Sequence, residues 1–300
     1  MTDSPAVQGR SLLLHQLVDA IQVAPAGEDV FTAVSPDWWG ERVFGGMVLA
    51  QVLNAAIRTT PADGGLPPHS VHGYFLRAVR PGSPVTLEVE HLRDSRSFAT
   101  RQVSASQDGR LTSRFACSFH AAEDGPEYQV PMPDVPSPDE GRADDGQPVD
   151  GQPVDGHGPP GPFDVVDLGP LRNADGTFSS SGRWWVRTCG RLPDDPALHG
   201  CALAIMSDLT RSSFRPLTLD EWGTHTDASI DHALWLHRPA RADEWLFYDL
   251  QALVNTGGRS VVRGSMYRRD GQLCMSMAQE LLIRPLPGQG GRAPWLGEGP

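Results

Sequence analysis

Asp208 is a carboxylate at the end of an apolar segment, ALHGCALAIMSDL at 197–209, whose composition predicts a buried helix. A helix C-terminus disfavours a negative charge, and burial does so too, so both effects would make this carboxylate a better proton acceptor. The same residue could instead be a solvated aspartate at a helix end. The pattern alone leaves both interpretations open.

Gln279 is an amide on an otherwise apolar strand face. In the predicted strand 272–283 it shares that face with Leu273, Met275 and Met277. A carboxamide carries a donor and an acceptor, so it could hold a water molecule and a carboxylate together. The alternative is an outward-facing polar residue, but a lone amide among apolar side chains requires a partner.

Gly45 and Gly46 begin a second apolar segment, FGGMVLAQVLNAAI at 44–57, which also predicts a buried helix. The free N–H groups at a helix N-terminus suit an anion or a polarised carbonyl group. The glycine pair is therefore a candidate substrate-binding element. A close contact between the helix and a sheet would explain Gly46 equally well.

Other chemistries are excluded by residue type or spacing. The chain has no lysine, which excludes a Schiff-base or P-loop lysine mechanism. It contains neither an HExxH metal motif nor a G-x-S-x-G nucleophile elbow. His232 and His237 fall on opposite faces of one predicted strand, so they are not a ligand pair, and with His72 they are interpreted as packing or rim residues. No metal site is expected.

The composition indicates a globular protein of the cytoplasm. A net charge of −12 argues against a nucleic-acid partner, although a few local arginines could still bind a small anion. Four scattered cysteines without a CxxC pair are typical of free thiols in a reducing compartment. No leader segment is evident, and no stretch approaches the roughly 18 to 20 apolar residues that would span a bilayer.

The predicted elements repeat along the chain. An amphipathic helix over 11–23 precedes the first buried helix, which is followed by four alternating, β-rich segments. After residue 162 a strand, the second buried helix and further strands follow in a similar plan, and Asp108-Gly109 and Asp270-Gly271 mark one hairpin in each half. The predicted strands are 70–79, 84–93, 98–106, 111–119, 183–189, 228–238, 245–254, 259–268 and 272–283.

This duplication predicts an α+β fold in which each of two like halves wraps an antiparallel sheet around one apolar helix. Alignment of the halves sets Asn54 opposite Asp208 and Cys117 opposite Gln279, so the first half lacks both groups and one site per chain is expected. The expected units are 1–120 and 163–286. Between them 121–162, rich in Pro, Gly and acidic residues with a tandem DGQPVDGQPVDG, is expected to be a disordered linker, and 287–300 a flexible tail.

Several segments resemble the bacterial acyl-CoA thioesterase II family. In the first half these are VFGGMVLAQVLNAA, HSVHGYFLRAVRPG and LRDSRSFATRQVSASQDG; in the second they are SDL, ASIDHALWLHRP, EWLFYD and MAQE. The likeness covers roughly 11–120 and 163–284 in register. It implies a double-hotdog fold and the hydrolysis of coenzyme A thioesters without a bound cofactor.

The resemblance also implies roles for three residues. The family's catalytic Asp, Thr and Gln fall on Asp208, Ser229 and Gln279, which would activate the attacking water together. Ser229 departs from the family's Thr, which keeps the hydroxyl but leaves its rotamer less fixed. The local alternative for Ser229 is a strand-edge serine in a turn bond.

Two other functions stay open at this point. A silent acyl-CoA binder is compatible with the change at Ser229. A hotdog enoyl-CoA hydratase would need an Asp and His pair on one helical segment, and is disfavoured because His199 precedes Asp208 by nine positions and no histidine follows. Duplicated hotdogs often assemble further, so a homo-oligomer is also left open.

Overall fold

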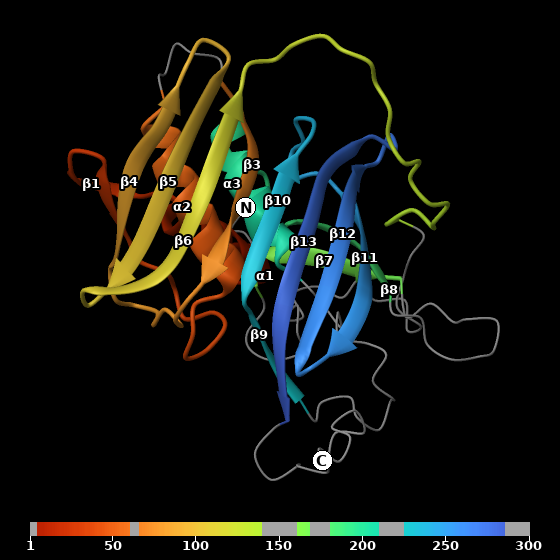
Figure 1. The fold of residues 1–300 in the computed structure, drawn as a ribbon. Helices are drawn as coiled ribbons and strands as arrows, with labels where there is room; N and C mark the ends of the chain where they lie inside the picture. The colour runs from red at the N-terminus through yellow and green to blue at the C-terminus, as the bar shows by residue number, and fades with distance from the viewer. Residues whose placement is uncertain (1–4, 61–65, 140–160, 169–180, 210–224, 286–300) are drawn as a thin grey trace, which may run out of the picture.

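The computed structural model describes residues 5–60, 66–139, 161–168, 181–209 and 225–285. The strands form one antiparallel sheet, ordered β1-β2-β4-β5-β6-β3-β10-β13-β12-β11-β8-β7, with β9 added beside β13. Figure 1 shows this sheet curving around the helices, with the first half in red to yellow and the second in green to blue. The predicted α+β double-hotdog fold is confirmed, with an antiparallel sheet that curves around the buried helices of the two halves.

The first half builds its sheet around helix α2, whose residues from Gly46 to Ala56 are all buried. That burial follows from the lack of a polar face, which the sequence predicted. Its elements are α1 (Pro5–Ile21), β1 (Ala24–Gly27), β2 (Val30–Ala33), α2 (Gly45–Arg58), β3 (Pro68–Phe75), β4 (Val85–Asp94), β5 (Phe98–Gln107) and β6 (Arg110–His120).

The second half repeats the plan around helix α3, which is buried from Leu198 to Ser207. Its elements are β7 (Phe163–Asp167), β8 (Ser181–Thr188), α3 (Pro196–Ser207), β9 (His225–Ser229), β10 (Asp231–Leu236), β11 (Leu246–Thr256), β12 (Arg259–Arg268) and β13 (Leu273–Pro285). The halves join in the middle of the sheet, where β3 pairs with β10 from Ser70–Trp235 to Tyr74–Asp231.

The predicted strand 228–238 is wrong in one respect, because it is divided at Ile230 into β9 and β10. Ile230 accepts a hydrogen bond from Phe75 N–H in the first half and donates one to the Glu280 carbonyl. The Asp231 carboxylate, rather than a backbone carbonyl, accepts a 2.7 Å hydrogen bond from Glu280 N–H. The chain can therefore pair with β13 through β9 and then cross to β3 through β10.

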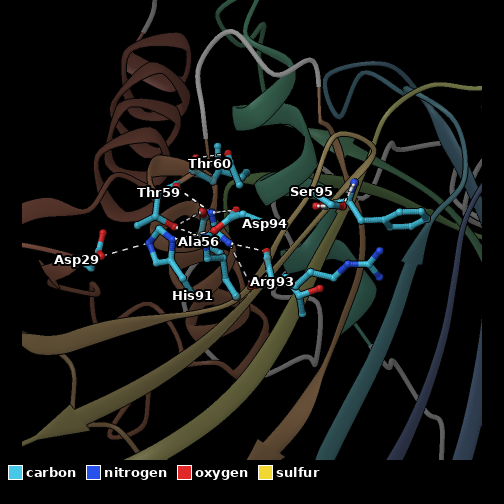
Figure 2. Close-up of polar contacts among 12 residues, drawn as sticks. Asp29, Ala56, Thr59, Thr60, His91, Arg93, Asp94 and Ser95 are labelled. Carbon is cyan, nitrogen blue, oxygen red and sulfur yellow. Dashed lines mark hydrogen bonds and ion pairs between the residues drawn. The ribbon is translucent and has the colours of Figure 1, made fainter.

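A buried arginine fixes the far end of α2. Arg101, on β5, is 1% exposed. It donates to the Thr59 carbonyl at 3.1 Å and to the Asp94 carboxylate at 2.7 Å. Figure 2 shows Thr59, just beyond the helix, beside Asp94 and His91 of β4. A cation at a helix C-terminus is favourable, so this group holds α2 in a fixed position against the first half of the sheet.

The expected linker differs from the prediction in its first part. Residues 121–139 form no helix or strand, but Gln129 bonds both the Gly271 carbonyl and the Leu273 N–H. Trp185 donates to the Pro136 carbonyl at 2.9 Å, and Met132 and Val135 pack on the apolar cluster around Trp185. These apolar residues anchor a segment that composition alone predicted to be disordered. The tandem repeat and the tail 287–300 lie outside the described residues.

Within the parts of the chain that the structure describes, no helix has the length and apolar character needed to cross a membrane.

Candidate active site

The candidate site lies where the C-terminal end of α3 packs against the N-terminal end of α2, the two buried helices lying side by side. Helix α3 ends at Ser207, and Asp208 is its C-cap residue, 3% exposed. Its carboxylate reaches the start of α2 in the other half, where Oδ2 accepts a 2.7 Å hydrogen bond from Gly46 N–H. Phe44, the N-cap residue of α2, supplies no side-chain cap of its own. Asp208 thus caps a helix that belongs to the other half of the chain.

Both glycines at the start of α2 are required by this close approach. A Cβ atom on Gly46 would lie 2.7 Å from the Ile205 carbonyl oxygen of α3. A Cβ atom on Gly45 would lie 2.7 Å from Asp208 Oδ2 and 3.2 Å from the Phe75 ring. The two 2.7 Å contacts are shorter than non-bonded atoms allow, so the glycine pair leaves room for the α3 terminus and its carboxylate.

The other carboxylate oxygen of Asp208 faces the two remaining predicted residues. Gln279 Nε2 donates to Asp208 Oδ1 at 2.6 Å and to Ser229 Oγ at 2.5 Å. The Ser229 hydroxyl donates to the same Asp208 oxygen at 3.2 Å. Ser229 ends β9 and Gln279 lies in β13, so the sheet brings both against the end of α3. The three residues that the family resemblance indicated form one hydrogen-bonded cluster.

These donors change the electrostatic expectation for Asp208. The sequence suggested a carboxylate opposed by its own helix dipole and by burial. In the structure the N-terminus of α2 faces it instead, and Gly46 N–H, Gln279 and Ser229 all donate to it. Donors and a helix N-terminus both favour the ionised form. The buried carboxylate is therefore stabilised as an anion by its neighbours.

His232 is a neighbour of the cluster that the sequence did not indicate as such. Its side chain is fully buried, with Nδ1 3.9 Å from Asp208 Oδ1 and Nε2 2.8 Å from the Ser207 hydroxyl. Burial is the main cause that lowers the pKa of His232 to about 3. The sequence placed His232 on the strand face opposite His237. It could not place His232 beside Gln279, because that requires the pairing of β10 with β13. His72 and His237 lie outside the Asp208 cluster: His72 packs against Trp235, and His237 bonds Ser276.

Tyr248 supports the end of α3 from β11. Its hydroxyl donates to the Ser207 carbonyl at 2.8 Å, and burial, with the nearby Asp208 charge, raises the pKa of Tyr248 well above its usual value. Tyr248 therefore stays a neutral donor. It fixes the last turn of α3, and with it the position of Asp208.

The corresponding point of the first half carries no such chemistry. Asn54, aligned with Asp208, accepts from Val23 N–H at 3.2 Å, and its amide faces Cys201 of α3 at 4.0 Å. Cys117, aligned with Gln279, is buried, and desolvation raises the pKa of its thiol. Burial likewise raises the pKa of the Cys201 thiol to about 12. Neutral thiols and an amide replace the carboxylate cluster there.

Comparison with known proteins agrees with the two-half architecture. Residues 35–120 match the family model of the acyl-CoA thioesterase N-terminal domain, and 133–283 match that of the acyl-CoA thioesterase C-terminal domain. The chain is 30% identical to acyl-CoA thioesterase 2 of Haemophilus influenzae, over 91% of this chain and 98% of that protein. It is 31% identical to human acyl-coenzyme A thioesterase 8, over 93% of this chain and 91% of the relative.

A solved structure gives the same result in three dimensions. The acyl-CoA thioesterase II of Mycobacterium marinum superimposes with a TM-score of 0.76 at 34% identity, covering 91% of this chain and 99% of that one. The similarity extends across both halves. The chain therefore belongs to the acyl-CoA thioesterase II family.

Proposed function

We propose that the protein hydrolyses acyl-CoA thioesters to a free acid and coenzyme A, with water activated by Asp208 and positioned by Ser229 and Gln279. The activity follows from family membership. The observation that supports these residue roles is the hydrogen-bonded cluster of a buried carboxylate, a hydroxyl and an amide at the junction of the two helices.

In this mechanism Asp208 acts as the general base. A water molecule bound beside Oδ1 gives its proton to the carboxylate while its oxygen attacks the thioester carbonyl carbon. The carbonyl π electrons move to the oxygen and form a tetrahedral oxyanion. Collapse of that intermediate breaks the carbon–sulfur bond, and the proton held by Asp208 passes to the leaving thiolate. One water is consumed, and one acid and one thiol are formed.

Ser229 and Gln279 hold the reacting groups in place. Their hydrogen bonds to Asp208 Oδ1 keep the carboxylate at one orientation, and the Ser229 oxygen is available to a water at the same point. A serine in place of the family's threonine retains this hydroxyl. The change therefore alters the rigidity of the site more than its chemistry.

The oxyanion needs donors, and the start of α2 is our candidate for them. The sequence suggested the N–H groups of Gly45 and Gly46. Gly46 N–H is directed at Asp208, so in this mechanism Gly45 N–H, in the same first turn, is the donor for the thioester oxygen. Aligned backbone dipoles at a helix N-terminus stabilise developing negative charge.

A compartment and an assembly state complete the proposal. The cysteines of the described residues, Cys117, Cys189, Cys201 and Cys274, are all free, which fits a reducing cytoplasm. The mass of the protein in solution will show whether its chains form a homo-oligomer.

Release of thiol from acyl-CoA, followed with a thiol-reactive dye, tests the function directly. A thioesterase releases coenzyme A with multiple turnovers. A silent acyl-CoA binder would bind the substrate without thiol release, and a hydratase would consume an enoyl-CoA without thiol release. Either of those outcomes would overturn the proposed function.

A further inference from the structure

His232 is a buried titratable side chain that the proposed mechanism does not use. It lies in β10, where Ala233 pairs with Ala278 of β13. The preceding residue of β10 and the following residue of β13 are therefore His232 and Gln279, opposite each other across the ladder. The histidine side chain has no exposed surface. The fold therefore places the His232 imidazole next to the side-chain amide of Gln279.

Each of these two side chains has one buried polar atom left without a partner. Among the described residues, His232 Nδ1 and Gln279 Oε1 are both buried and neither has a hydrogen-bond partner. Leaving such an atom unsatisfied is unfavourable, so native structures rarely do so. The other polar atoms are engaged: His232 Nε2 faces Ser207, and Gln279 Nε2 donates to Asp208 and Ser229.

One choice of tautomer satisfies both atoms. With the proton on Nδ1, the imidazole donates to Gln279 Oε1. The Ser207 oxygen lies 2.8 Å from both the Ala204 carbonyl oxygen and His232 Nε2, and in this tautomer its hydroxyl proton turns from the carbonyl to the free Nε2. With the proton on Nε2, two acceptors, Nδ1 and Oε1, would face each other in a buried position. Rotating the amide would relieve that contact only by bringing its oxygen to 2.6 Å from Asp208 Oδ1, another acceptor.

We propose that His232 is a positioning residue whose Nδ1–H holds the Gln279 carbonyl, so that the amide nitrogen faces Asp208 and Ser229. This inference rests on the proposed role of Gln279 in the thioesterase site. His232 touches neither the substrate nor the reacting water in this arrangement. It acts by allowing only one orientation of the amide.

The electrostatics of His232 suit a fixed neutral donor. Burial first, and then the neighbouring His72, lower its pKa to about 3, while a contact with the Gln279 side chain acts in the opposite direction. The imidazole is therefore neutral near neutral pH. A single tautomer can then persist while Asp208 takes up and releases protons.

Two isosteric variants separate this role from simple packing. Asn carries its amide near the position of Nδ1, and Gln carries its amide near that of Nε2. His232→Asn retains a donor to Gln279 and loses the bond to Ser207, whereas His232→Gln does the reverse. We expect His232→Gln to lower kcat about ten- to hundred-fold with little change in KM, and His232→Asn to keep most of the wild-type kcat.

A double-mutant cycle with Gln279→Ala tests whether the effect passes through the amide. His232→Gln should lower kcat no further when Gln279 is already absent, because the group that it positions has been removed. An equal loss in both backgrounds, or a kcat for His232→Asn at or below that of His232→Gln, would overturn the proposal.

A measurement on the unaltered protein keeps the test independent of folding and of activity. The ¹⁵N chemical shifts of the His232 ring show which nitrogen carries the proton. A protonated Nδ1 is expected, and a protonated Nε2 would contradict the inference even if the variants fail to fold. Because this readout needs no turnover, it also distinguishes failure of the inference from failure of the proposed thioesterase function, which the thiol-release assay reports.

Discussion

The carboxylate of Asp208, the C-cap residue of helix α3 in the second half, accepts a 2.7 Å hydrogen bond from Gly46 N–H at the start of α2 in the first half. This one hydrogen bond therefore pairs a free N–H group at a helix end of the first half with the proposed base of the second half. The site and the packing of the two halves depend on the same pair of residues. Changes on either side should affect both stability and turnover.

Gly46→Ala should destabilise the protein and slow turnover. The new Cβ would lie 2.7 Å from the Ile205 carbonyl oxygen and 2.8 Å from the Phe44 ring, so α2 and α3 must separate. Overpacking of this kind costs about 1 to 3 kcal/mol. Denaturant unfolding and thiol release measure the two effects.

Gly200→Ala is the matched control, because the alignment that sets Asn54 opposite Asp208 also sets Gly46 opposite Gly200. Its nearest neighbour for a new Cβ is Leu236 Cδ1 at 4.0 Å, which is open space for a methyl group. Alanine in a helix interior is favoured over glycine by about 0.5 to 1 kcal/mol. Stability at or above the wild type is expected here, and equal losses for the two variants would contradict the close approach of α2 and α3.

Ser229→Thr should keep the activity, and Ser229→Ala should reduce it. The hydroxyl donates to Asp208 and accepts from Gln279, whereas an added methyl group suits an extended strand. Initial rates of thiol release from one acyl-CoA, with Tm values for all three proteins, check this prediction. Identical kcat values across the three would show that the Ser229 oxygen plays no part in the reaction.

Asn54→Ala should cost stability without affecting catalysis. Asn54 occupies the point equivalent to Asp208 in the first half, and it accepts from Val23 N–H in a buried position. Loss of that acceptor leaves a buried donor unpaired, at about 1 to 3 kcal/mol. Unfolding free energy and kcat are measured on the same preparation, and a large fall in kcat of the folded variant would mean that the first half also has a catalytic site.

Residues 1–125 and 160–300, produced separately, should be poorly soluble and inactive. Their separation exposes the β3 and β10 edges and removes Gly46 N–H from Asp208. Co-expression should restore thiol release. Full activity of the isolated 160–300 fragment would show that the first half contributes nothing to the site.

Much of this fold is predictable from local pattern. Apolar composition on every side predicts the two buried helices, and the Asp-Gly pairs predict the hairpins. Asp108 and Gly109 adopt positive φ angles of 53° and 71°, and Gly271 one of 82°. Such angles suit glycine and are tolerated by aspartate. These features depend on neighbours in the sequence, so the sequence is sufficient to find them.

The remaining features depend on partners distant in the chain. The short strands β1, β2 and β7 carry too few residues for a clear alternation, and the break at Ile230 results from two different strands on its two sides. The alignment that sets Cys117 opposite Gln279 also sets Arg101 opposite Arg263. Yet Arg101 is buried against Thr59, whereas Arg263 bonds Gln251 on an exposed surface.

The candidate site likewise has features that the sequence predicts and features that depend on partners distant in the chain. Family resemblance was sufficient to single out Asp208, Ser229 and Gln279 as a set, although composition alone could not distinguish the carboxylate from a solvated helix end. The contact with Gly46, and the place of His232 behind Gln279, need the helix packing and the strand register. The sequence signal for His232 was only an imidazole in a predicted strand.

The most direct test of the central claim is the turnover of Asp208→Asn. The amide oxygen can still accept from Gly46 N–H, while the amide NH2 group replaces an acceptor of the Gln279 donor, so the protein should fold with a Tm below that of the wild type. It cannot accept the proton of the attacking water, so kcat for thiol release should fall about a hundred- to ten-thousand-fold. Asp195→Asn, at the exposed N-cap of the same helix, retains its capping bond to Ala197 N–H and should behave as the wild type. Wild-type turnover by a folded Asp208→Asn protein would contradict the assignment of Asp208 as the general base.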